Sequence, residues 1–204
     1  MLILKNSFLR YNFYMSEQRA KFTQMKDGDA EDYSIIAASN AKDYNHLADK
    51  VLTHLKMLEN DFGGFQVDRL THSLQTATRA YRDGRDDEYV VCALIHDIGD
   101  NLAPANHAEF AATILQPFVS EENYWIVKHH GIFQGYYFFE FLGLDKNMRD
   151  KYINSPYFES CREFCEKYDQ NSFDPDYDTL ELDFFIPMVK ELFKKPKRSI
   201  YLQS

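Results

Sequence analysis

The sequence predicts an all-α protein, a bundle of about seven to eight helices. Apolar residues recur at steps of three and four over most of the chain, whereas few segments alternate with a period of two. The length of 204 residues fits one domain that buries a real core. We therefore expect a single domain over residues 1–204, with a core of roughly 30–193 and tails at 1–15 and 194–204.

The first two predicted helices cover residues 32–60 and 67–82, and each has one apolar stripe. The stripe residues are Tyr44, Leu47, Val51, Leu55 and Leu58 in the first helix, and Val67, Leu70, Leu74, Ala77 and Tyr81 in the second. His72 lies off the second stripe, on a face that it shares with polar residues such as Gln75 and Thr76. That face is either solvated or the wall of a polar cavity.

The third predicted helix, residues 86–98, carries apolar residues on all sides and should therefore be central. Asp86 and Asp87 stand near its start, where the helix dipole favours negative charge. Gly99 follows as a natural stop. The remaining predicted helices cover residues 106–115, 121–130, 146–153, 157–169 and 180–193.

The adjacent pair His96-Asp97 stands at the end of an apolar run, residues 89–95. The run predicts a buried helix or strand, so both polar side chains approach the interior. Desolvating an imidazole and a carboxylate without a partner is costly. A metal ion would satisfy both, because histidine supplies a nitrogen and aspartate an oxygen that can bind one cation or bridge two.

Further residues of the metal-binding types occur along the chain. In order, the candidates are His72, His96, Asp97, His107, one of His129 and His130, and Asp169. One metal takes about four protein ligands, so six candidates indicate two metals. A single histidine would more often be structural or solvated, so the prediction depends on the whole set.

The same residues resemble a known family. The order of His72, His96-Asp97 and Asp169, with the phrases Thr-His-Ser-Leu-Gln-Thr-Ala at 71–77 and Leu-Ile-His-Asp-Ile-Gly at 94–99, resembles the HD-domain superfamily over roughly residues 61–175. The additional histidines are similar to those of members with two metals. Among these, the chain resembles the mixed-valent di-iron oxygenases, which include myo-inositol oxygenase and enzymes that cleave the carbon–phosphorus bond of hydroxylated aminoethylphosphonates.

The resemblance implies a single HD domain with two Fe ions, as a mixed-valent Fe(II)/Fe(III) pair, and O₂ as co-substrate. The implied ligands are His72, His96, Asp97 and Asp169 for one iron, and Asp97, His107 and His130 for the other. Asp97 would bridge the irons, and His96 and Asp97 would be the catalytic residues. We prefer His130 to His129 because a similar stretch of small and aromatic residues follows the ligand in inositol oxygenase. His129 would then contact the substrate or support a ligand.

Substrate contacts are expected to differ from those of the family. Asp100 stands where relatives have His or Lys, and Phe62 and Phe65 stand where phosphonate-cleaving relatives can have Tyr and Glu. Aromatic residues could wall a pocket for an ammonium zwitterion that pairs with Asp100, or they could belong to the core. The substrate-binding candidates are Asp100, Gln134, His129, Phe62 and Phe65, and further pocket candidates are Phe133, Tyr136 and Tyr137.

Three functions are compatible with this set of candidate residues: two kinds of enzyme and a sensor. By resemblance, an oxygenase would use O₂ to cleave a C–P or C–C bond of a small hydroxylated substrate, first of all a 1-hydroxy-2-aminoethylphosphonate-type compound, N-methylated or not. The alternative is a two-metal HD phosphohydrolase acting on a nucleotide or phosphomonoester, which predicts cations near the metals. The candidate cations are Arg69, Arg79, Arg82, Arg85 and Lys128. A metal-stabilised sensor without turnover is the third.

Composition limits the partners and the compartment. The net charge of −9 argues against nucleic acid or a membrane surface as a partner, so a small-molecule substrate is expected. The N-terminal apolar run is too short for a membrane span or a secretory signal. The three cysteines, which lack a zinc-type pairing, suggest a reducing, cytoplasmic setting. The basic stretch at 194–198 is most simply a solvated tail.

Overall fold

The computed structural model describes residues 18–200, and their secondary structure is wholly helical. The predicted tail at residues 1–15 lies outside this range. The chain separates into two compact units, with the boundary between Asp43 and Tyr44. The first unit contains a 3₁₀ turn, Met25–Asp27, and most of α1, Ala30–Asn45. The predicted all-α class is confirmed, with eight α-helices over the described residues.

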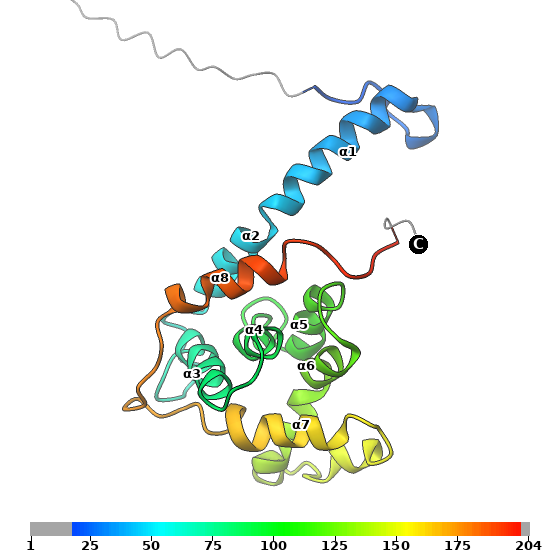
Figure 1. Ribbon diagram of the computed structural model, residues 1–204. Coiled ribbons are helices and arrows are strands. Elements are labelled where there is room, and N and C mark those ends of the chain that lie inside the picture. The colour runs from blue at the N-terminus through cyan, green and yellow to red at the C-terminus, as the bar shows by residue number, and fades with distance from the viewer. Residues whose placement is uncertain (1–17, 201–204) are drawn as a thin grey trace, which may run out of the picture. The chain divides into compact units, whose positions relative to one another are not determined.

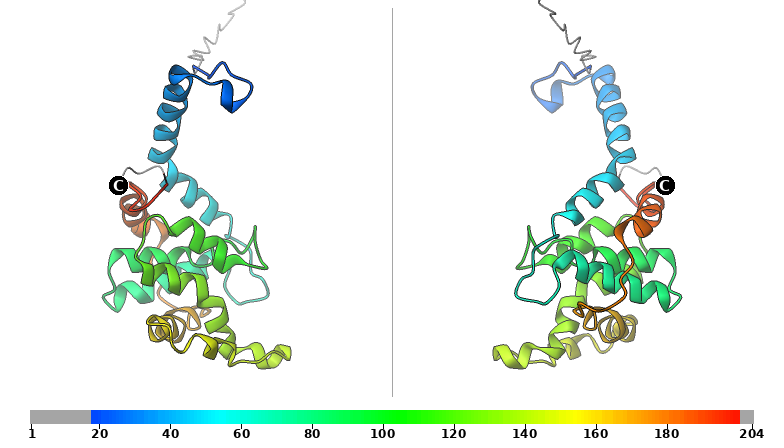
Figure 2. Two further views of the ribbon diagram at one scale, coloured as in Figure 1. Left: turned by 90° about the vertical axis from the view of Figure 1, so that its right-hand side faces the viewer. Right: turned by 90° about the vertical axis from the view of Figure 1, so that its left-hand side faces the viewer.

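The second unit carries the candidate site and is built from seven α-helices and several shorter turns. The α-helices are α2 Leu47–Lys56, α3 Arg69–Arg82, α4 Asp87–Ile95, α5 His107–Leu115, α6 Glu121–Gln134, α7 Phe158–Phe164 and α8 Leu182–Leu192. The 3₁₀ helices are Gly135–Tyr137, Phe139–Leu142 and Met148–Tyr152, and a π-helix covers Cys165–Asp169. The turned views of Figure 2 show the 3₁₀ segments, coloured yellow-green, at one edge of this unit. The helix predicted at 146–153 is therefore a short 3₁₀ helix.

Helix α4 is the centre of the second unit, as the apolar run predicted. In Figure 1 it lies between α3 and the α5–α6 pair, and it packs against α3, α6 and α8. Val90, Val91, Ala93, Leu94 and Ile95 are fully buried. A helix that is apolar on every side is stable only where neighbours cover all of its faces. The residues that follow α4 consequently enter the middle of the unit.

Side-chain caps fix where three of the helices begin. Asp68, Asp86 and Ser120 each accept a hydrogen bond from the backbone N–H three residues ahead, at the starts of α3, α4 and α6. Each such cap is worth about 1 kcal/mol. Helix α3 therefore starts one residue after Asp68, which places His72 one turn inside the helix.

Gly99 has a different role from the predicted one. Its backbone does not adopt the left-handed conformation that glycine provides at helix ends. A Cβ at this position would instead lie 2.9 Å from both Cα and the carbonyl oxygen of His107. Glycine is needed here because the start of α5 packs directly on the turn that follows α4.

The basic C-terminal stretch contacts the second unit. The backbone N–H of Lys197 donates to the carbonyl of Pro117, and its side chain pairs with Glu88. Arg198 donates to the carbonyl of Val119. Lys194, Lys195 and Lys197 are nevertheless exposed, so the solvated tail stays a prediction. None of the helices within residues 18–200 has the length and apolarity to span a bilayer.

Candidate metal centre

The fold brings all six predicted ligands together at one place. His72 lies on α3, His96 and Asp97 form the turn after α4, and His130 lies on α6. His107 is the first residue of α5, and Asp169 is the last residue of the π-helix. These residues come from five separate segments, yet two groups of three have ligand atoms within 4.8 Å of one another: His72, His96 and Asp169, and His96, Asp97 and His130. A third such group joins Asp97 and His107 to Asp100.

Asp97 is the centre of the cluster, because its two oxygens face two different pairs of imidazoles. Its Oδ2 lies 3.3 Å from Nε2 of both His72 and His96. Its Oδ1 lies 3.0 Å from Nε2 of His130 and 3.5 Å from Nε2 of His107. A carboxylate in this position can bridge two cations.

The cluster has an inner group and an outer group on the two sides of Asp97. The inner group is His72, His96 and Asp169, and the outer group is His107 and His130. In the inner group, Asp169 Oδ1 lies 3.3 Å from Nε2 of His72 and 3.6 Å from Nε2 of His96. With one oxygen of Asp97, this group offers four donor atoms, which is the usual number for one metal.

The orientation of the imidazoles leaves their Nε2 atoms free for a cation. Nδ1 of His72 lies 3.0 Å from the carbonyl of Ser172, Nδ1 of His96 2.8 Å from that of Ala93, and Nδ1 of His130 2.7 Å from that of Val127. A carbonyl can only accept, so each Nδ1 carries the proton. In the neutral ring, Nε2 then presents its lone pair to the cluster. This arrangement is typical of metal-binding histidines.

Protons on the inner imidazoles would balance the carboxylates when no metal is bound. Burial by itself lowers the pKa of His72, but hydrogen bonds to Asp169 and Asp97 outweigh it and raise this pKa to about 9. The two carboxylates likewise raise the pKa of His96 well above its usual value, against the effect of burial. Burial raises the pKa of Asp97 and Asp169, but the imidazoles hold both well below the usual range. A cation that binds here replaces these protons.

Two further observations show that the residues fit a metal. Nε2 of His72 lies only 3.2 Å from Nε2 of His96, so two lone pairs face each other in the neutral rings. Oδ2 of Asp169 is buried and has no hydrogen-bond partner among the described residues. Both features cost free energy unless a positive charge lies between the groups. The donor set of imidazoles and carboxylates suits divalent transition metals, iron and zinc among them.

The π-helix explains how Asp169 reaches the cluster. The sequence predicted one helix over 157–169. The structure instead has α7 followed by a π-turn, and Asp169 is buried. The extra residue in a π-turn rotates the side chains that follow, and such turns often occur at functional sites. Gln134 on α6 then donates to Asp169 Oδ1 at 3.1 Å.

The turn that carries the dyad has a support that sequence analysis set aside. Nε2 of His54 lies 3.0 Å from the carbonyl of Ile98, and the His54 ring stacks on Phe110. Because Ile98 follows Asp97 directly, α2 and α5 both hold this turn in place. A histidine outside the ligand set gives no local sequence signal for such a role.

A cavity of about 560 Å³ opens beside the cluster. Its wall includes five ligand candidates, with Asp100, Gln134, Phe65 and Tyr137 from the predicted substrate contacts and pocket residues. Arg69, one of the candidate cations, also lines the wall beside Asp100. Val67, Phe138, Gln170 and Phe173 line it as well, and sequence analysis did not identify them. Phe173 stacks on Phe65 at 4.7 Å and on His72 at 4.4 Å between ring centroids.

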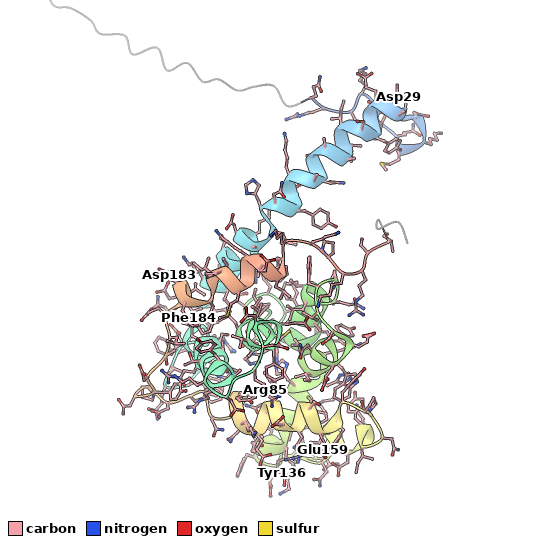
Figure 3. All side chains as sticks on the ribbon, viewed as in Figure 1. Asp29, Arg85, Tyr136, Glu159, Asp183 and Phe184 are labelled. Carbon is pink, nitrogen blue, oxygen red and sulfur yellow. The ribbon has the colours of Figure 1, made fainter. Side chains whose placement is uncertain are left out.

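Four predicted residues do not line this cavity. Phe62 is about half exposed, and Phe133 is fully buried in the core. Tyr136, labelled in Figure 3, is partly exposed and stacks with Arg149. His129 stacks on Trp125 at 4.0 Å between ring centroids, and its Nδ1 lies 2.8 Å from the carbonyl of the same residue. The structure therefore separates His129 from its neighbour His130, whose Nε2 faces Asp97.

Asp100 already has a cationic partner in the protein. Arg69 donates to its Oδ2, and Nδ1 of His107 lies 3.2 Å from its Oδ1. The Asp100 side chain is only 7% exposed. The predicted pairing of Asp100 with a substrate cation is therefore replaced by an internal ion pair.

The other candidate cations lie away from the cavity. Arg79 stacks on Tyr177, Arg82 pairs with Asp178, Arg85 pairs with Glu163, and Lys128 lies over Tyr124. Arg85, labelled in Figure 3, also donates to the Tyr168 hydroxyl and so joins the loop before α4 to α7 and the π-helix. Among the described residues that line the cavity, Arg69 alone is a lysine or arginine.

The comparisons with known proteins agree with this geometry at the level of the family. No curated protein matches the chain. The family model of the HD domain matches residues 69–155. This segment contains His72, the His96-Asp97 dyad, His107 and His130, while Asp169 lies after it. The match supports the assignment of residues 69–155 to the HD-domain superfamily and indicates a metal-dependent enzyme.

Proposed function

We propose that the protein is a two-metal oxygenase of the HD-domain type. It would use O₂ to cleave a C–P or C–C bond of a small hydroxylated substrate. The first candidate substrate is a 1-hydroxy-2-aminoethylphosphonate-type compound, with or without N-methyl groups. Two Fe ions would be held by His72, His96, Asp97 and Asp169 on one side and by Asp97, His107 and His130 on the other. When bound, the irons would supply the redox chemistry with O₂.

The observation that carries this proposal is the position of Asp97 between the inner and outer groups. One carboxylate faces four Nε2 atoms at 3.0–3.5 Å, two from each oxygen. The cavity beside it has room for a small substrate, and part of its wall is aromatic. The chain would orient the substrate between this wall and the cluster, while Asp97 fixes the spacing of the two metals.

The alternative, a phosphohydrolase for nucleotides or phosphomonoesters, would use the same ligands and the same cavity. Sites that bind phosphate commonly use free lysine or arginine side chains. Here Arg69 is already held by Asp61 and Asp100, with its Nε 3.2 Å from Oδ2 of Asp61. A phosphate or a phosphonate group would therefore be neutralised by the metals and not by a free side chain on the described part of the cavity wall, so the reaction itself must separate the two candidate functions.

Oxygen uptake by anaerobically purified, iron-loaded protein tests the proposal. A panel of 1-hydroxyphosphonates, 1-hydroxy-2-aminoethylphosphonates with increasing N-methylation, and polyols would be compared. We expect two irons per chain and substrate-dependent O₂ consumption. We also expect a signal of a coupled Fe(II)/Fe(III) pair in electron paramagnetic resonance. His130→Ala should abolish uptake, and the matched control His46→Ala, at an exposed histidine outside the cluster, should retain it.

Two results would contradict the oxygenase. Hydrolysis of nucleotides or phosphomonoesters with manganese, magnesium or zinc, without O₂ consumption by any substrate, would establish the phosphohydrolase instead. Binding of the same compounds without any reaction, unaffected by His96→Ala, would indicate a sensor or binding module.

A further inference from the structure

Asp100 is a carboxylate beside the cluster that contacts both a candidate ligand and an arginine. It is nearly buried and lies three residues after Asp97. Its two oxygens face two different partners: Oδ1 lies 3.2 Å from Nδ1 of His107, and Oδ2 accepts from Arg69. Nε2 of the same His107 ring faces Asp97. Asp100 thus stands directly behind one of the candidate ligands.

Arg69 is held in place by a loop that closes around its guanidinium. Its backbone N–H donates to the carbonyl of Asp61 at 2.9 Å, and its Nε lies 3.2 Å from the Asp61 carboxylate. A Cβ at Gly63, where φ is +51°, would lie 2.7 Å from Nη2 of Arg69. Arg69 is also the first residue of α3, three residues before His72. The guanidinium therefore has a position that is fixed from both the helix and the loop.

The His107 ring has a carboxylate beside it in addition to a backbone carbonyl, that of Pro104. Nδ1 of His72, His96 and His130 each faces a neutral backbone carbonyl. His107 has a carboxylate within 3.2 Å of its Nδ1. A carboxylate keeps the proton on Nδ1 and makes Nε2 a stronger donor to a metal. Arg69 offsets the cost of burying that negative charge.

We propose that Asp100, held by Arg69, is a positioning residue for His107 and sets the metal affinity of the outer group. The inference rests on the proposed two-metal centre. His107 needs this support because it is at the first residue of α5 and is 29% exposed, whereas the side chains of the other three histidines are at most 5% exposed. Loss of the Arg69–Asp100 pair should therefore weaken the outer metal and leave the inner metal bound.

Zinc titration of the chelator-stripped full chain against a chromophoric chelator tests the proposal. In Asp100→Ala and Arg69→Gln, we expect the second zinc to bind about 10- to 100-fold more weakly and the first to bind as in the wild type. The double variant should be no weaker than Asp100→Ala, because both residues act through one contact. Arg82→Gln is the matched control, since Arg82 lies on the same helix and pairs with the exposed Asp178.

A second measurement separates a positioning role of Asp100 from a general loss of structure. In zinc-loaded protein, nitrogen-edited NMR of the histidine rings should show a changed Nδ1 proton for His107 in Asp100→Ala, with the rings of His72, His96 and His130 unchanged. If that variant does not fold, Asp100→Asn, which keeps the shape and removes the charge, should show a smaller loss of the second zinc.

The possible failures are distinguishable. If the wild type binds two zinc ions and both Asp100 variants bind them with unchanged affinity, this inference is overturned and the proposed metal centre stands. A wild type that binds fewer than two zinc ions would overturn the metal centre and the inference together.

Discussion

The inner and outer groups of the cluster differ in how far their side chains are buried. The side chains of the inner group, His72, His96 and Asp169, are 0–5% exposed, and α3, the end of α4 and the π-helix enclose them. In the outer group, His130 is equally buried, but His107 is 29% exposed and lies at a helix start. The inner group is thus part of the core, whereas one ligand of the outer group belongs to the cavity wall.

In the proposed two-metal centre, this difference would give the two metal positions different roles. A closed set of four donors holds a metal tightly and leaves few positions for a substrate. The outer group has only His107, His130 and one oxygen of Asp97, so more positions remain open on the side of the cavity. Burial lowers the pKa of His107, as do the charges of His130 and His96, against the effects of Asp97 and the Pro104 carbonyl. A neutral His107 is ready to bind a metal at neutral pH.

Removal of the shared residue should eliminate both positions. Asp97→Ala takes one donor from each group and leaves the imidazoles without their common anion. We expect both metals to bind at least about 100-fold more weakly, with no detectable turnover. Metal analysis after gel filtration checks this, and Asp178→Ala, at a carboxylate that is 91% exposed, is the control. Retention of two metals by Asp97→Ala would exclude the bridge.

Single ligands from the two groups should give unequal losses. His107→Ala should bind one metal per chain and retain the inner one, because the inner group keeps all four donors. His72→Ala should lose the inner metal and weaken the outer one, since Asp97 then lacks one of the two imidazoles that face its Oδ2. Zinc stoichiometry by mass spectrometry under native conditions measures both. If both variants lost the same number of zinc ions, the inner and outer groups would not differ in the way described.

The contact between Gly99 and α5 should matter for the outer group more than for the inner one. In Gly99→Ala, the new Cβ meets the backbone of His107, which cannot move without displacing α5. We expect a loss of about 1–3 kcal/mol in the free energy of unfolding and a weaker second metal. Urea denaturation of chelator-treated protein measures the first effect. Gly131→Ala is the control for stability alone, because its Cβ would make ordinary contacts at 3.6–4.0 Å with the His107 ring and Ala108.

The sequence alone indicated more of the candidate ligands than of the contacts that hold them in place. The histidine candidates could be selected because the chain has seven histidines and because an apolar run predicted where the His96-Asp97 pair would be buried. The preference for His130 over His129 came from the family resemblance. The central position of α4 followed from the same run. These features depend on residue type and local periodicity, which are visible without the fold.

The parts that could not be predicted depend on contacts between distant residues. Arg69 and Asp100 are 31 positions apart, and no local pattern indicates that they pair. The π-turn at Asp169 and the close approach of α5 to Gly99 depend on how neighbouring helices pack. For the same reason the aromatic residues near the dyad could not be divided into core and cavity wall.

The pH dependence of stability should differ between metal-free and metal-loaded protein. The pKa of His72 is about 9 in the folded chain and near 6.5 in the unfolded one, so its contribution to stability is fully present below pH 6.5 and is lost as the pH rises through 9. We expect the Tm of chelator-treated protein to fall by on the order of 5 °C between these values. With zinc bound, the inner imidazoles carry no proton to lose, and Tm should stay nearly constant. A parallel fall in both forms would contradict the exchange of protons for metal.

The smallest effect is expected at His129, the neighbour of a ligand candidate. Its ring stacks on Trp125 and meets the edge of Tyr152 at 4.7 Å, so His129→Ala should cost about 1 kcal/mol of stability. Both metals should remain, because its Nδ1 lies near the Trp125 carbonyl and the ring belongs to this aromatic stack. His130→Ala should lose the outer metal, and its secondary structure should change no more than that of His129→Ala. Circular dichroism and metal analysis of the two variants, measured side by side, decide which of the two histidines is the ligand. If His129→Ala loses a metal and His130→Ala does not, the outer group must be rebuilt around His129, and the turn of α6 that presents it would differ from the one described.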